Sequence, residues 1–457
     1  MKPAPFFHPA FRGKFGVARR DISPPPGIYS RNWGAAKTDI ATSLHRPLTV
    51  TALIIQEEAG GDPLALIALD LGWWRSAEEE TLLGNAVMTC GIKPGHYMLA
   101  LSHTHSGPVF CRGESEKPGG ELIDSYLRHL EKQVSEATTE ALQTVRPGLL
   151  EVATGKCGLA GNRDLPDPDK DRLIVGWNPD LPADDTLLVG RVSDEAGICL
   201  ATIANYACHP TILAWENTSI SPDFIGAMRE VVETETAAPC LFLQAASGEL
   251  SPRHQYVGDP KVADRAGRCL GHAVLGVNYE MLLPGDELAF EGSLESGASL
   301  AIWSVRQRPT ISNSIAVRDL AIEHPLKQGF PSVEELQEQI AACTDRVLGE
   351  RLQRRLLHRK SLGDSTATRR VHHLWRVGDI LLISIPDEAY SEMQMELRQT
   401  AGKSPVLLAT VTNGSRGYLS PHHSYAADSY AAGQSPYAAG CFEKTLSLLQ
   451  SEMQKLS

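Results

Sequence analysis

The stretch ALSHTHSGPVF, residues 100–110, places two histidines two positions apart, directly after an apolar run. Such a run is typical of a buried β-strand, on which the side chains of residues i and i+2 point to the same face. The Ser-Gly-Pro that follows ends the strand, because proline lacks the N–H that a sheet ladder needs. His103 and His105 therefore leave a strand end together, which suits a metal site or an acid/base pair if other segments supply partners.

The pattern around this stretch predicts a mixed α/β (α+β) fold. HRPLTVTALIIQ and PLALIALDLG are typical of adjacent strands, and residues 120–145 carry the three- and four-residue apolar spacing of a long amphipathic helix. Strands and helices alternate without a regular βαβ rhythm, so we expect a mixed β-sheet core flanked by helices. Although the length is enough for two or three domains, no repeat or linker divides the chain, and we expect residues 1–457 to form one large unit. Residues 330–362 are strongly charged and helical in pattern, and we expect them to form a solvated helical insertion at the surface.

Composition excludes several classes of protein. The 457 residues carry a formal charge of −12, which leaves no basic surface for nucleic acid or for anionic lipid. No apolar run is long enough to span a membrane, so we expect no transmembrane segment. The opening residues lack the apolar region of a secretory signal, and the nine cysteines show no CxxC pairing. We therefore expect a cytoplasmic protein with reduced thiols, although a leader could have been removed.

Further polar residues stand where apolar strands end. His209 closes the run TIANYACH, Glu388 follows ILLISIP, and a long tyrosine-rich loop, NGSRGYLSPHHSYAADSYAAG, follows VLLATVT. Taken singly, each has a structural explanation: a hydrogen-bonded buried histidine, a carboxylate near a helix N-terminus, and an ordered surface loop. Together they provide the nitrogen and oxygen ligands that zinc accepts, so the residues alone indicate a hydrolytic zinc site. Asp70 and Asp223 are candidates for the groups that orient its histidines.

The order of these motifs resembles that of the neutral/alkaline (non-lysosomal) ceramidases. The resemblance spans roughly residues 15–440 and rests on the following segments: ARRDISPPPG, LHRPLTVTALII, HTHSGP, NRD, NYACHPT, QAASGELSP, IPDE and GYLSPHHSYAADSY. It implies a single catalytic domain of neutral-ceramidase type, in which zinc-activated water cleaves an amide (N-acyl) bond.

The resemblance also implies a role for each matching residue. The implied zinc ligands are His103, His209, Glu388 and Tyr418, and the implied catalytic residues are His105, Arg163, Tyr430 and Ser251. Ser251 matches a serine regarded either as catalytic or as a substrate contact. Two features depart from the family near it, because Glu249 replaces an aspartate and Arg253 replaces an asparagine. The element Pro-Asp-Glu also stands where the family commonly has Pro-Gly-Glu.

The departures leave the substrate open. Family members that act on ceramide typically carry a signal sequence and a C-terminal β-sandwich domain, and we expect neither here. An N-acylated small molecule in the cytosol is therefore as good a candidate as ceramide. Two alternatives remain: a metal-dependent hydrolase of an ester or glycosidic bond, and a non-catalytic binding module. A serine hydrolase is disfavoured, because Ser251 has no GxSxG motif around it. We expect Trp73 and Trp74 to pack in the core rather than to form a pocket wall.

Overall fold

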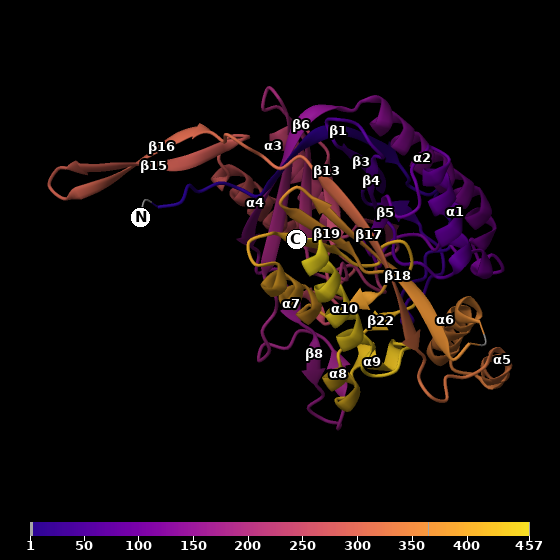
Figure 1. Cartoon of the computed structure of the whole chain (residues 1–457). Helices are drawn as coiled ribbons and strands as arrows, with labels where there is room; N and C mark the ends of the chain where they lie inside the picture. Colours follow the sequence, from indigo (N-terminus) through magenta and orange to yellow (C-terminus); the bar gives the residue numbers. More distant parts are fainter. Residues whose placement is uncertain (1–2, 364, 457) are drawn as a thin grey trace.

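Two β-sheets lie face to face between two outer layers of helices (Figure 1). The structure is a computed structural model that describes residues 3–363 and 365–456. The expectation of a mixed sheet core flanked by helices is confirmed. Among the described residues, no helix combines the length and hydropathy that crossing a bilayer requires.

The large sheet has eight strands in the order β13-β11-β10-β6-β1-β3-β4-β5. Its two outermost pairs, β11–β13 and β4–β5, are parallel and the pairs between them are antiparallel. The strands are β1 (Ala10–Asp21), β3 (Thr49–Gln56), β4 (Leu64–Leu69), β5 (Tyr97–Leu101), β6 (Arg146–Lys156), β10 (Thr186–Asp194), β11 (Cys199–Tyr206) and β13 (Cys240–Gln244).

The apolar runs of this sheet are continuous because both of its faces are covered. Along β3, Val50, Ala52 and Ile54 face the helical layer, whereas Leu53 and Ile55 face the second sheet. This is the two-residue alternation of a strand with two buried faces. The helices on the outer face are α1 (Ala77–Met88), α2 (Ile123–Gln143), α3 (Phe224–Thr236) and α4 (Pro260–Glu280).

The second sheet has four strands in the order β17-β18-β19-β21 and is covered by α7 and α10. Trp375, Leu382 and Leu407 of this sheet pack against the large one, while Leu374 and Ile383 pack against the two helices. Its elements are β17 (Ile315–Pro325), β18 (Ala367–Val377), β19 (Ile380–Ser384), β21 (Val406–Ala409), α7 (Glu392–Ala401) and α10 (Cys441–Lys455).

Short elements complete the chain and carry much of the candidate site. They are β2 (Ser43–Leu44), β7 (Ala160–Asn162), β8 (Asp164–Pro166), β9 (Leu173–Val175), β12 (Ser219–Ile220), β14 (Leu250–Pro252), β20 (Glu388–Ala389), β22 (Tyr418–Leu419), α5 (Val333–Ala342), α6 (Arg346–Leu362), α8 (His422–Ala426), α9 (Tyr430–Gln434) and the 3₁₀ turns Arg112–Glu114 and Gly120–Leu122.

One hairpin leaves the body of the molecule. Strands β15 (Asp286–Glu295) and β16 (Ser299–Gln307) form an arm that extends away from the sheets in Figure 1. Its outer part is exposed, including the large apolar side chains of Leu294, Trp303 and Val305.

Candidate metal centre

His103 and His105 meet just beyond the end of β5. The strand stops at Leu101, so the two histidines lie in the following loop rather than on the strand itself. Their rings are nevertheless 4.9 Å apart, with 3.4 Å between the two Nε2 atoms. His103 has a φ of 68°, in a region that residues other than glycine seldom occupy. A strained histidine at a strand end is typical of a functional site, because the surrounding structure has to hold it there.

His209 reaches the same point from the end of β11. Its ring lies 4.8 Å from that of His103, and both side chains are almost completely buried. The Nδ1 atom of His209 is 2.7 Å from the backbone oxygen of Ser247, and that of His103 is 3.0 Å from the oxygen of Gly72. Each Nδ1–H therefore donates to a carbonyl, which leaves both Nε2 lone pairs directed at the centre of the site.

The proposed carboxylate orienters are wrong. Asp70 forms a buried ion pair with Arg229, and Asp223 accepts hydrogen bonds from the backbone of Leu213 and Phe224 at the start of α3. Backbone carbonyls do the orienting instead. The sequence could not indicate this, because every residue carries a carbonyl and only the folded loops decide where each one points.

Glu388 and Tyr418 enter the centre from two short parallel strands. β20 pairs with β22 so that Glu388 lies directly beside Tyr418. One carboxylate oxygen of Glu388 is 3.1 Å from Nε2 of His209 and 3.3 Å from Nε2 of His103. The two histidines and the carboxylate thus come together at one point from three distant parts of the chain.

Arg163 lies between β7 and β8 and is hydrogen-bonded to Tyr418. Its guanidinium donates to the backbone oxygen of Gly248 at 2.7 Å and to the phenol oxygen of Tyr418 at 2.9 Å. It is also 3.4 Å from Nε2 of His209. Tyr430, at the start of α9, packs edge-on against Tyr418 and is 42% exposed, so it lines the opening of the site.

Ser251 lies near the centre without touching it. The serine is on β14, which pairs with β7 beside Arg163, and its hydroxyl accepts a hydrogen bond from Gln255. Glu249 binds the backbone N–H of Ser391 with both carboxylate oxygens, so it supports the loop that precedes α7. Glu249 thus has a structural role in this protein, whereas the role of Ser251 stays a prediction.

Burial controls the protonation of the centre. Burial and then the Arg163 guanidinium lower the pKa of His209 to about 3, and burial with the neighbouring imidazoles lowers the pKa of His105 well below its ordinary value. Burial alone would raise the pKa of Glu388, but His103 and His209 outweigh it and hold that pKa well below its usual range. A neutral imidazole at His209 beside an ionised carboxylate at Glu388 is the form in which these two groups bind a metal ion.

The donor set fits a divalent cation. His103, His105 and His209 each offer a ring nitrogen, and these atoms lie within 4.8 Å of one another. Glu388 adds an oxygen within 3.3 Å of two of these nitrogens. Nitrogen and carboxylate ligands in a buried cluster suit zinc and similar first-row ions.

Comparisons with known proteins identify the fold. The neutral ceramidase from Pseudomonas aeruginosa superimposes with a TM-score of 0.69 at 18% sequence identity, covering 97% of this chain and 74% of that one. A second solved structure, described as ceramidase complexed with C2, gives a TM-score of 0.68 at 17% identity, covering 96% of this chain and 74% of the other. The protein has a neutral ceramidase-type fold. No protein-family profile and no curated protein sequence matches the chain.

Within this ceramidase-type fold, aromatic rings wall the centre. Trp73 and Trp33 lie 4.9 Å and 5.4 Å from the ring of His105, and Trp33 also contacts Trp215. Trp74 is fully buried in the core, where its indole N–H donates to the backbone oxygen of Val411. The core-packing interpretation is therefore right for Trp74 and incomplete for Trp73, which packs against the same core and also lies beside His105.

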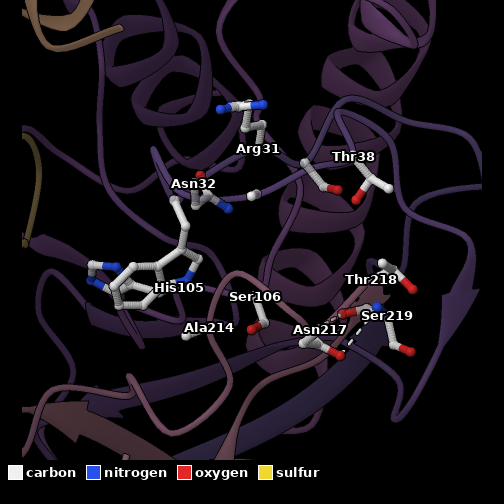
Figure 2. Close-up of a pocket in the computed structure, with 12 residues that line it drawn as sticks. Arg31, Asn32, Thr38, His105, Ser106, Ala214, Asn217, Thr218 and Ser219 are labelled. Carbon is white, nitrogen blue, oxygen red and sulfur yellow. Dashed lines mark hydrogen bonds between the residues drawn. The ribbon is translucent and has the colours of Figure 1, made fainter. Parts of the chain in front are cut away.

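A polar cavity adjoins the same histidine. Residues 30–38 and 214–219 line it, and Figure 2 shows His105 at one end with Thr38, Thr218 and Ser219 toward the other. Hydroxyl and amide groups dominate this lining. The space next to His105 therefore suits a water molecule or a similarly small polar group rather than an aliphatic chain.

The region 330–362 also contributes to the site. It forms α5 and α6, which pack against each other, and many of their side chains are exposed. One face of α6, however, packs inward: Leu357 contacts the core beneath Trp73, and the Arg354 guanidinium lies 5.8 Å from the Trp73 ring. The expectation of a merely solvated surface insertion is therefore incomplete, because α6 forms part of the wall of the site.

Proposed function

We propose that the protein is a zinc-dependent hydrolase that cleaves an amide (N-acyl) bond. The observation that carries the proposal is the meeting of His103, His209 and Glu388 around one point. The ceramidase-type fold supports the same reaction, since the solved neighbours are described as ceramidases.

We assign the zinc ligands as His103, His209, Glu388 and Tyr418. The first two histidines each have Nδ1 tied to a backbone carbonyl, which fixes the ring for ligation through Nε2. The ring of His105 has no such carbonyl partner among the described residues. A ring without this restraint is free to exchange protons, which favours an acid/base role for His105 over a ligand role.

The chemistry follows from these positions. Bound zinc would lower the pKa of water to about 7 and so supply a nucleophile at neutral pH. His105, Arg163 and Tyr430 surround the place where a substrate carbonyl would lie, and their N–H and O–H groups would stabilise the negative charge on its oxygen. His105 would take the proton that the attacking water releases and pass it to the leaving nitrogen. Ser251 is proposed as a substrate contact.

The substrate we propose is an N-acylated small molecule, with a ceramide-like lipid as one member of that class. The net charge of −12 disfavours nucleic acid as a partner. A cytoplasmic location is part of this proposal.

The test combines metal analysis with a substrate panel. We expect about one zinc per chain and turnover of at least one N-acyl substrate. Both should be lost in His103→Ala and His209→Ala and kept in His272→Ala, which removes an exposed histidine on α4. Turnover of only esters or only glycosides would favour the second enzyme class. A folded, metal-free protein without turnover would support a binding module and overturn the proposal.

A further inference from the structure

Two arginines share one tryptophan at the wall of the candidate metal centre. The guanidinium of Arg75 lies 5.0 Å from the centre of the Trp73 ring, and that of Arg354, on α6, lies 5.8 Å from it. The same ring is 4.9 Å from His105 and 6.0 Å from His103. The two cations therefore belong to the wall that a substrate bound at these histidines would touch.

Asn32 holds both guanidinium groups in place. Its side-chain oxygen accepts a hydrogen bond from Arg75 at 2.9 Å, and its backbone oxygen accepts one from Arg354 at 2.7 Å. A neutral oxygen and an indole face thus fix the orientation of the Arg354 cation without neutralising it. Positioning of this kind prepares a charge for a ligand.

The carboxylates near Arg75 and Arg354 do not neutralise both positive charges. Arg75 has one carboxylate partner, Glu114, at 3.4 Å, and within the described part of the chain no carboxylate lies within 4 Å of Arg354. Glu350, one turn earlier on α6, forms its ion pair with Arg31 and also approaches Arg346, so it acts on Arg354 only from beyond 4 Å. Burial and then the charge of Arg75 lower the pKa of Arg354, as expected for a cation beside a like charge.

The other arginines near the centre have different partners. Arg163 donates to Gly248 and Tyr418, and Arg416 pairs with Glu80. Arg354 is partly exposed, and among the described residues its guanidinium donates to the backbone oxygen of Asn32 and has no carboxylate within 4 Å.

We propose that Arg354 and Arg75 on Trp73 form a subsite for an anionic oxygen group of the substrate, a carboxylate, sulfonate or phosphate. The planar fork of a guanidinium matches such groups with two parallel hydrogen bonds. The inference deepens the proposed function: it rests on the amide substrate and narrows it to amides that carry an acidic group. A neutral ceramide would leave this subsite without a partner.

The first experiment measures binding and needs no turnover. Calorimetry on the full-length protein compares octanesulfonate with 1-octanol, which have the same chain and no bond to hydrolyse. We expect the sulfonate to bind more tightly, and we expect that binding, unlike that of the alcohol, to weaken with added salt. Arg354→Gln should weaken sulfonate binding by about tenfold or more, because a hydrogen bond to a charged group is lost.

Two further variants separate the charge of Arg354 from the shape of its guanidinium and from general effects on the fold. Arg354→Lys keeps the charge but loses the fork, so its affinity for the sulfonate should be intermediate. Arg351→Gln removes an exposed arginine from the same helix and should bind as the unchanged protein does. Equal affinity for sulfonate and alcohol in the unchanged protein, or equal loss in Arg354→Gln and Arg351→Gln, would overturn the subsite.

The second experiment measures specificity. N-dodecanoylglycine and N-octylsuccinamate carry a carboxylate on either side of the amide, and N-dodecanoylethanolamine is the neutral reference. We expect at least one anionic amide to have the higher kcat/KM, and Arg354→Gln to lower its ratio to the reference about tenfold. A preference for the neutral amide would overturn the subsite. If no amide is cleaved but the sulfonate still binds through Arg354, the proposed function fails and the subsite stands.

Discussion

The two walls of the site are built in different ways. The inner wall consists of His103, His209 and Glu388, which are nearly buried and stand within hydrogen-bond distance of one another or of backbone carbonyls. The outer wall consists of Trp73 and Arg354, which are partly exposed and meet through stacking on a ring. A buried, fully bonded wall holds one geometry, whereas a stacked wall tolerates exchange of its side chains. We infer that the inner wall determines the reaction and the outer wall selects the substrate.

The most direct way to break this comparison is to remove an inner-wall histidine. His209→Ala deletes a nitrogen within 3.1 Å of Glu388, and we expect zinc to be lost and amide turnover to fall by at least about 1000-fold. Plasma emission spectroscopy measures the metal, and circular dichroism checks the fold. Retention of zinc with normal turnover would show that His209 is not a ligand.

A smaller change, beside the inner wall, tests the phenol of Tyr418, which lies next to Glu388. Tyr418→Phe removes the oxygen that accepts a hydrogen bond from Arg163 at 2.9 Å, and we expect kcat to fall by about 10- to 100-fold. Tyr425→Phe is the matched control, because among the described residues that phenol bonds to Ser435 and Tyr437 and to none of the groups of the centre. Equal effects of the two substitutions would show that Tyr418 has no special role.

An outer-wall change should leave the metal in place. Trp73→Leu removes the ring beneath the Arg75 and Arg354 guanidinium groups, and we expect KM for the substrate to rise about 3- to 30-fold with unchanged zinc content. Trp303→Leu, on the exposed arm, is the control. Loss of zinc in Trp73→Leu would mean that the two walls do not act separately.

The smallest expected effect concerns the support behind the inner wall. Burial raises the pKa of Glu249 from 4.5 to about 7. Between these pH values the folded protein keeps a proton that the unfolded chain has released, so the free energy of unfolding falls as the pH rises through this range. Burial also raises the pKa of Asp223 to about 7, so this group lowers the free energy of unfolding over the same pH range.

Glu249→Gln removes the titration of this group. Urea unfolding at pH 5 and pH 8 should show a smaller loss of stability in Glu249→Gln than in the unchanged protein, with the part due to Asp223 retained. Glu334→Gln, at an exposed position on α5, should show the full loss. An undiminished loss in Glu249→Gln would contradict the proposed titration of this buried carboxyl.

Local patterns predicted the strands that carry the site. The adjacent strands expected from HRPLTVTALIIQ and PLALIALDLG are encoded in neighbouring residues, and they appear in the structure as the pair β3 and β4. The chain also places a histidine after β5, another after β11 and Glu388 after β19. Strand and turn signals act over a few residues, so they can be recognised without knowing the rest of the fold.

The sequence did not indicate the carbonyls that orient the histidines, nor the outer wall, for a different reason. The Gly72 and Ser247 carbonyls that hold His103 and His209 have no side chain that could mark them. Arg354 belongs to a charged helix whose sequence is typical of a solvated surface, and nothing local distinguishes its inward face from its exposed one.

The sequence by itself determined the residue types and their positions at strand ends, because periodicity and turn chemistry are local properties. Only the tertiary structure decided which of them meet. Arg163 and Tyr418 are 255 positions apart, and His209 and Glu388 are 179 apart. Contacts at such separations depend on how two sheets and their helices pack, since packing alone fixes the distances and directions of groups that no local signal connects.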